Sequence, residues 1–186
     1  YRILHRQDNA DQRLTPIGFE LGLVSRAQYE HVQEKYLSVE REIKRLDHTG
    51  APPGPALEQF LELRGEPPAR SGARLSDLLR RPPVTYEDLA AFDPARPPLP
   101  LEVCQAVEIS IKYQGYIERQ LRQVQEMKKL ENKPLPAELD YTQIEGLRLE
   151  ARQKLNQIKP LNLGQASRVS GVSPADIAVL MIYLEK

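Results

Sequence analysis

The sequence has little of several features that mark whole classes of protein. It has one cysteine, Cys104, and no apolar run approaching the roughly 18 residues that a membrane helix needs. A single cysteine can form no internal disulfide, which excludes a disulfide-stapled scaffold and fits a reducing compartment. We therefore expect a cytoplasmic protein with no membrane span and no signal peptide. The three histidines (His5, His31, His48) lie far apart in the sequence, so we expect no metal site.

Runs of alternating β-branched residues are also missing, and this predicts an all-α fold. The net charge is zero, which argues against a strongly basic nucleic-acid module, although a balanced total can hide a basic face. What is present, 40% hydrophobic and 28% charged residues, is typical of an ordinary globular domain. The chain opens on Tyr1 without an initiator methionine, so we interpret it as a fragment of a longer protein.

Residues 101–131 belong to the longest stretch that has no proline and only one glycine, Gly115. We expect one long helix here, or two helices joined at Gly115. Apolar residues are spread widely around the helix before Gly115 and narrow to one face after it, which predicts a buried first half and a half-exposed second half. A glycine inside a helix costs about 1 kcal/mol relative to alanine, so we expect a close backbone approach or a kink to explain it.

A second long helix is predicted from Arg26 to about His48, because Ser25 and Gln28 have the spacing of a capping box. Its apolar residues recur at intervals of three and four and form a seam: Tyr29, Val32, Tyr36, Val39, Ile43 and Leu46. Such a seam needs a partner. We expect an antiparallel pairing with residues 117–130, with a homotypic coiled coil as the alternative.

Prolines divide the rest of the sequence into short segments. Thr15 and Pro16 have the pattern of an N-cap and first helical residue, so a short helix is expected to start there. Most of the 16 prolines fall in 51–100, where we expect short helices. The segment after Lys133 is predicted to be a linker, followed by three short helices. The predicted architecture is therefore long antiparallel helices with short proline-broken helices (1–133), then a small C-terminal helical bundle (134–186).

The last segment has two possible functions. Ser167, Gly171, Ile177 and Leu180 have the spacing of a DNA-binding helix-turn-helix, with Pro174 opening the second helix. That helix, however, offers almost no side chain that could read bases or bind phosphates. A packed bundle or a protein-docking surface is the better interpretation.

Cations and aromatic residues gather around Gly115: Lys112, Tyr113, Tyr116, Arg119 and Arg122. This mixture suits RNA phosphates and unstacked bases. The alternative is that both tyrosines are buried and the cations only solvate the outer face.

The opening residues are dense in charge: Arg2, Arg6, Asp8, Asp11 and Arg13. Arginine forks and carboxylates this close can form a network that fixes a loop against a neighbouring surface. The alternative is a solvated charged turn, because surface pairs of this kind are common and weak.

Several blocks together carry a resemblance to a known family: YRILHRQDNADQRLTPIGFELGLV (1–24), KYQGYIERQ (112–120), LPAELDY (135–141), GLRLEARQKLNQIKP (146–160) and LGQASRVSGVSPADIAVL (163–180). The chain resembles the C-terminal region of the MnmG/GidA family, which modifies tRNA uridine with a carboxymethylaminomethyl group. The match runs in order along the whole chain. It is loose in 51–100 beyond LSDLLRRPPVTYEDLA (75–90).

The resemblance implies that full-length members are homodimers that bind FAD through an N-terminal dinucleotide fold. It implies that they work with the GTPase MnmE on C5 of the wobble uridine, using methylenetetrahydrofolate and NADH. This chain has no GxGxxG and no candidate acid/base cluster. We therefore expect no catalytic, cofactor-binding or metal-binding residue in it.

By this resemblance the chain would supply tRNA contacts and the surface on which MnmE docks. The candidate tRNA-binding residues are Arg2, Arg6, Arg13, Lys112, Tyr113, Tyr116, Arg119 and Arg122. The candidate partner-binding residues are Gln165, Ser167, Arg168, Gly171, Ile177 and Leu180. Two other functional classes stay open: a helix-turn-helix DNA-binding regulator, and a structural helical interaction module.

Overall fold

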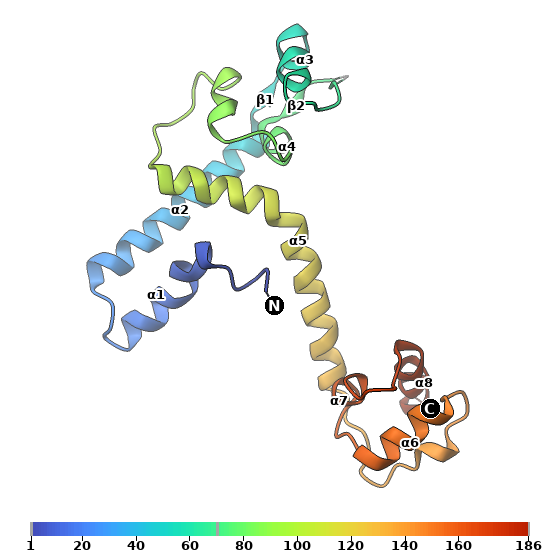
Figure 1. Cartoon of the computed structure of the whole chain (residues 1–186). Helices are drawn as coiled ribbons and strands as arrows, with labels where there is room; N and C mark the ends of the chain where they lie inside the picture. Colours follow the sequence, from blue (N-terminus) through green and yellow to red (C-terminus); the bar gives the residue numbers. More distant parts are fainter. Residues whose placement is uncertain (1, 70, 186) are drawn as a thin grey trace. The chain divides into compact units, whose positions relative to one another are not determined.

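The computed structural model describes residues 2–69 and 71–185, and it is helical, as the sequence predicted (Figure 1). Packing divides the chain into two compact units, 1–118 and 119–186. The division falls inside one continuous helix, so the predicted single long helix is confirmed. The domain boundary that the sequence placed after Lys133 stays a prediction. No helix within the described ranges combines the length and the apolar content needed to span a bilayer.

The elements have the following bounds. The first unit contains η1 (Gln7–Asn9), α1 (Ala10–Glu20), α2 (Arg26–His48), β1 (Gly50–Ala51), α3 (Pro55–Glu62), β2 (Ala73–Arg74), α4 (Leu75–Leu79), η2 (Glu87–Ala91) and the first part of α5 (Leu101–Glu131). The second unit contains the rest of α5, then η3 (Tyr141–Gln143), α6 (Leu149–Ile158), α7 (Leu163–Ser167) and α8 (Pro174–Leu184).

Helix α2 begins where its capping box predicts. The Ser25 Oγ accepts a hydrogen bond from the Gln28 N–H at 3.3 Å, and the Gln28 Oε1 accepts one from the Ser25 N–H at 3.0 Å. The start predicted for the preceding helix was wrong, because α1 begins at Ala10 and Pro16 lies inside it. The Thr15–Pro16 pattern gave the wrong start because a proline inside a helix removes one backbone hydrogen bond, and the other hydrogen bonds of α1 keep the helix continuous.

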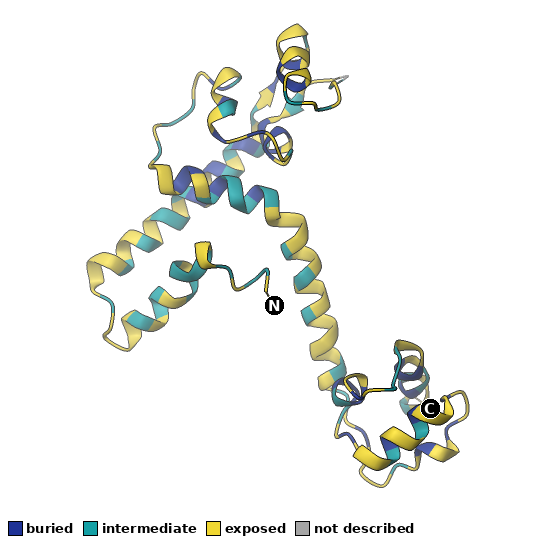
Figure 2. Cartoon of the chain, viewed as in Figure 1, coloured by how far each residue is buried: buried dark blue, intermediate teal, exposed yellow. Residues whose placement is uncertain are grey.

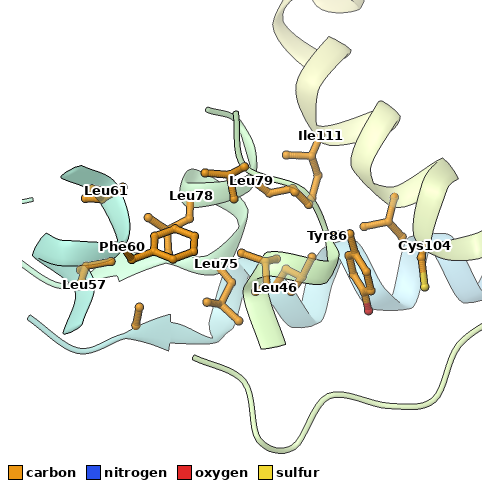
Figure 3. Close-up of a cluster of buried hydrophobic side chains, with 14 of the residues drawn as sticks. Leu46, Leu57, Phe60, Leu61, Leu75, Leu78, Leu79, Tyr86, Cys104 and Ile111 are labelled. Atoms are coloured by element: carbon orange, nitrogen blue, oxygen red, sulfur yellow. The ribbon is translucent and has the colours of Figure 1, made fainter. Parts of the chain in front are cut away.

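The core of the first unit lies where α2, α3, α4 and α5 meet (Figure 3). Leu46 of α2 and Val107 of α5 are both fully buried there. The partner expected for the α2 seam was therefore wrong: its buried part packs with the first half of α5, while α1 and α4 contact α2 elsewhere. The physical reason is area, because the first half of α5 is apolar over more of its circumference and removes more surface from water.

A two-stranded antiparallel sheet, which the sequence did not predict, connects the C-terminal end of α2 with the N-terminal end of α4. It pairs Gly50 with Arg74 and Ala51 with Ala73. Strands of two residues carry no alternation that a sequence pattern could reveal. The Leu75 N–H donates to the Thr49 carbonyl at 2.9 Å and extends this junction.

The second unit is a small bundle built on one apolar cluster: Leu135, Tyr141, Ile144, Leu147, Ala151, Leu155, Leu163, Ala166, Ile177 and Leu180. The segment after Lys133 is not the free linker that the sequence predicted. Leu135 is 5% exposed, and its N–H donates to the Leu161 carbonyl at 2.9 Å. Pro134 and Pro136 suppress helix there, but Leu135 between them still enters the core.

Helix α8 begins at Pro174, as the sequence predicted, and Ser173 and Asp176 form a capping box there. The Asp176 carboxylate accepts from the Ser173 N–H at 2.8 Å and also from the guanidinium of Arg148 at 2.6 Å. Asp176 is 2% exposed. The hydrogen bonds from Arg148 hold the pKa of its carboxyl well below the usual range. This pair fastens the start of α8 to the start of α6.

Candidate functional site

The opening segment forms one of the predicted pairs of arginine and carboxylate, Arg6 with Asp8. The Arg6 Nε donates to Asp8 Oδ1 at 2.9 Å and its Nη1 donates to the Ile3 carbonyl at 2.9 Å. Arg13 donates to Asn9 Oδ1 at 2.9 Å. The hydrogen bond from Arg6 lowers the pKa of Asp8. Arg6 and Arg13 are thus engaged in fixing the segment, whereas Arg2 is exposed. Tyr1 lies outside the described residues.

A second network, which sequence reasoning missed, attaches α1 to α2. The Asp11 carboxylate accepts from Lys35 Nζ at 2.7 Å and from the Tyr36 hydroxyl at 2.6 Å. Burial, together with the hydrogen bond to Asp11, raises the pKa of the Tyr36 hydroxyl. No local sequence pattern marks this network, because Asp11 lies 24 and 25 positions from its two partners.

A cleft of about 580 Å³ lies between the opening segment, α2 and the first part of α5. Its polar lining includes Arg6, Asp8, Lys35, Tyr36 and Glu102. Charges of both signs line it and most are paired with one another. Such a lining does not attract a phosphate, so we do not place an RNA site inside this cleft.

The candidate residues on α5 within the first unit behave differently from one another. Lys112 donates to Glu108 Oε1 at 2.8 Å and to the Pro82 carbonyl at 3.1 Å, so it anchors α5 to the loop after α4. Tyr113 is 40% exposed and Tyr116 is 60% exposed. Their ring centroids lie 6.3 Å apart with the planes tilted by 52°. The alternative of two buried tyrosines is therefore wrong.

Arg119 and Arg122 lie on the part of α5 that belongs to the second unit, and both are exposed. Within the described ranges, neither side chain forms an ion pair or a hydrogen bond with another residue. The exposure of this half of α5, predicted from its narrow apolar face, is visible in Figure 2. Lys128 and Lys129 are exposed further along the same half. Exposed cations without carboxylate partners keep their full charge available for a phosphate.

The candidate partner-binding residues fall into two groups. Gln165, Ser167, Arg168 and Gly171 lie at or near the surface of the second unit. Arg168 Nη1 lies 2.9 Å from Glu131 Oε1, and Gln165 Oε1 accepts from the Leu161 N–H at 2.8 Å.

Ile177 and Leu180, by contrast, are 6% and 0% exposed and belong to the core of the bundle. This corrects their assignment: any effect that they have on a partner is indirect, because they hold α8 in place.

The outer side of α8 shows a different apolar surface. Ile182 is 62% exposed and Tyr183 is 42% exposed, beside a shallow cleft of about 380 Å³ that also involves Ile144 and Val179. The sequence showed that this helix is apolar nearly all round but could not tell which side faces inward. The exposed side carries no Lys or Arg, which disfavours a DNA-recognition helix.

Cys104 is 8% exposed, and burial raises the pKa of its thiol, which is the environment of a packing residue rather than a reactive one. Within residues 2–69 and 71–185, no group of three His, Cys, Asp or Glu side chains is arranged to hold a metal ion.

Comparisons with known proteins cover nearly the whole chain. Residues 26–121 match the family model described as tRNA modifying enzyme MnmG/GidA C-terminal helical domain, and residues 123–186 match the one described as the C-terminal helical bundle of the same enzyme.

Individual relatives agree with the family models. The tRNA uridine 5-carboxymethylaminomethyl modification enzyme MnmG of Caldicellulosiruptor saccharolyticus is 53% identical over all 186 residues, and that of Lachnoclostridium phytofermentans is 52% identical. The chain spans 30% of the length of each. The structure of Aquifex aeolicus GidA in its form II crystal is similar, with 34% identity and a TM-score of 0.61, covering 97% of this chain and 28% of that one.

Proposed function

The chain belongs to the MnmG/GidA family of tRNA-modifying enzymes, and from this we propose that it is the region that binds tRNA and docks a partner protein. The full-length enzyme would install the carboxymethylaminomethyl group at C5 of the wobble uridine, together with the GTPase MnmE. It would act in the cytoplasm as a homodimer. The observation that supports a binding role is the exposed, unpaired state of Arg119 and Arg122 on α5.

The residues of this chain do not fit the flavin cofactor that the family implies. FAD is held at the carboxyl ends of strands in an open parallel sheet, beside a glycine-rich turn. The sheet in the described part of the chain has two strands of two residues each, and the sequence has no GxGxxG. No step that uses FAD, NADH or methylenetetrahydrofolate is assigned to these residues. We propose that this chemistry belongs to the remaining 70% of the full-length protein.

We propose that tRNA lies along the exposed half of α5 with its phosphates near Arg119 and Arg122. Each phosphate contact contributes a salt-dependent term, because a bound cation releases condensed counterions. Arg6 and Arg13 would act indirectly, by holding the opening segment in place, since their guanidinium groups already bind Asp8 and Asn9. Arg2 is exposed and could reach a phosphate directly.

A titration of unmodified tRNA tests this role. Arg119→Glu with Arg122→Glu should weaken binding at least tenfold and reduce the slope of log K against log salt by about 2. Arg41→Glu is the matched control, because Arg41 is an exposed arginine on α2 and the same charge reversal there should have little effect. Equal loss in the control and the test variants would mean that only net charge matters. Preferential, salt-sensitive binding of duplex DNA would favour the regulator instead.

For the partner, we propose that MnmE docks on the second unit, at Gln165, Ser167, Arg168 and Gly171 and on the apolar outer side of α8. An exposed aliphatic and aromatic pair such as Ile182 and Tyr183 is typical of a protein-binding surface. Ile182→Asp should abolish capture of the chain by immobilised MnmE. Leu161→Asp, which alters an equally exposed leucine of the same unit, should not. A chain that binds neither tRNA nor MnmE would be a structural module.

A further inference from the structure

Gly115 lies in the interior of the 31-residue helix α5, and no packing contact with the described residues requires a glycine there. A Cβ added at this position would meet no atom within 4 Å beyond the helix itself and the adjacent residues. The residue is helical and does not have a positive φ. Glycine therefore weakens the helix by about 1 kcal/mol without relieving a clash or permitting an unusual backbone conformation.

The rings of Tyr113 and Tyr116 are close to Gly115 on α5. Tyr116 is 60% exposed, which is unusual for a residue of this size, and Tyr113 is 40% exposed. Tyr113 has a protein partner, because the guanidinium of Arg6 lies 5.0 Å from its ring centroid. Tyr116 has no ring or cation partner in the described residues except its tilted contact with Tyr113. One face of an aromatic ring is thus open to solvent next to a backbone without a side chain.

We propose that this surface is a seat for one unpaired nucleotide of RNA, with the base against the Tyr116 ring and the sugar-phosphate crossing the helix at Gly115. The inference rests on the proposed tRNA-binding role and adds where an unstacked base is held. Bases stack on exposed aromatic rings in proteins that bind single-stranded RNA, largely without regard to sequence. Close approach of a ligand to the backbone is a common reason for glycine where internal packing does not require it.

Electrostatics favours a nucleotide over an apolar protein segment as the occupant. Four exposed cations follow Tyr116 on α5 and form no ion pair within the described residues: Arg119, Arg122, Lys128 and Lys129. Lys112 and Lys133, by contrast, are paired with Glu108 and Glu185. An aromatic ring among excess cations matches a base attached to a phosphate, whereas an apolar helix would leave those cations without partners.

Gly115→Leu should block the proposed site without disturbing the fold. The added side chain has room in the protein, and leucine is a good helix former. The variant should unfold at the same or a higher temperature, yet bind unmodified tRNA roughly 5- to 150-fold more weakly, the range expected for loss of one stacked base. Gln125→Leu, an exposed position of the same helix, is the matched control and should bind within about twofold of the parent. A single-stranded oligoribonucleotide should compete with tRNA for the parent but not for Gly115→Leu.

Substitutions of Tyr116 provide a second test of the proposed site. Tyr116→Phe keeps the ring and should bind like the parent, whereas Tyr116→Leu should resemble Gly115→Leu. The chain has no tryptophan, so Tyr116→Trp introduces a unique fluorophore that a stacked base should quench.

Each contrary result has a definite meaning. Unchanged tRNA affinity in Gly115→Leu overturns the nucleotide seat and leaves the proposed function standing. A parent chain that binds no tRNA overturns both. A variant with weaker MnmE capture and unchanged tRNA affinity shows that the surface contacts protein. A lower unfolding temperature in Gly115→Leu contradicts the premise that the position has room.

Discussion

The guanidinium of Arg6 lies 5.0 Å from the centroid of the Tyr113 ring, so the opening segment and helix α5 are joined across 107 sequence positions. Arg6 is itself fixed by Asp8 and by the Ile3 carbonyl. The arginine therefore orders the opening segment, and the tyrosine gives it a surface to lie on.

Arg6→Ala should release residues 3–9 from α5, because it removes the hydrogen bonds to Asp8 and Ile3 and the contact with Tyr113. We expect faster amide hydrogen exchange confined to these residues and a loss of about 1 kcal/mol in the free energy of unfolding. Arg2→Ala, at an exposed arginine of the same segment, is the control and should exchange like the parent. Unchanged exchange in Arg6→Ala would contradict the role given to this contact.

Arg45 is the cation that pairs with two buried carboxylates in the first unit. Its guanidinium binds Glu42 Oε1 at 2.7 Å and Asp93 Oδ2 at 2.5 Å, and these carboxylates are 3% and 4% exposed. Arg45→Ala would leave two buried carboxylates without a countercharge and should cost about 3–5 kcal/mol, measured by urea unfolding. Arg41→Ala, one turn earlier and exposed, should change stability by less than about 0.5 kcal/mol. Similar effects of the two substitutions would show that the network contributes little.

The pH dependence of the second unit should be governed partly by Asp176, whose pKa is lowered by hydrogen bonds from Arg148 and Ser173. A carboxyl with a depressed pKa stabilises the folded state fully above the unfolded value of about 3.9, and the stabilisation is lost as pH falls below it. Thermal unfolding between about pH 6 and pH 2 should therefore show a steeper loss for the parent than for Asp176→Asn.

At neutral pH, Asp176→Asn should be less stable by at least about 1 kcal/mol, because it removes the negative charge that accepts the hydrogen bonds of Arg148. Identical pH profiles for the parent and the variant would remove Asp176 from this role.

The two sides of α8 should respond oppositely to truncation. Leu180 is fully buried, so Leu180→Ala should destabilise the protein by about 2–5 kcal/mol and leave a cavity. Ile182 is 62% exposed, and Ile182→Ala should change stability by less than about 0.5 kcal/mol while weakening capture by MnmE. Reversed stabilities would mean that α8 packs through its other face.

The sequence by itself determined the elements whose causes are local. The Ser25–Gln28 capping box placed the start of α2, Pro174 placed the start of α8, and the stretch without proline predicted the whole of α5. The ordered blocks such as KYQGYIERQ were enough to indicate the family. Capping bonds and helical periods involve residues at most a few positions apart, and a single stretch of sequence therefore contains all the information that they need.

Tertiary structure alone decided which faces became interior and which side chains met. The buried part of the α2 seam packed with the first half of α5, Leu180 turned inward while Ile182 stayed outside, and Asp11 met Lys35 and Tyr36. These outcomes depend on which arrangement of all the elements buries the most apolar area and leaves the fewest buried charges unpaired. That comparison involves contacts between residues far apart in the chain, and no local pattern records it.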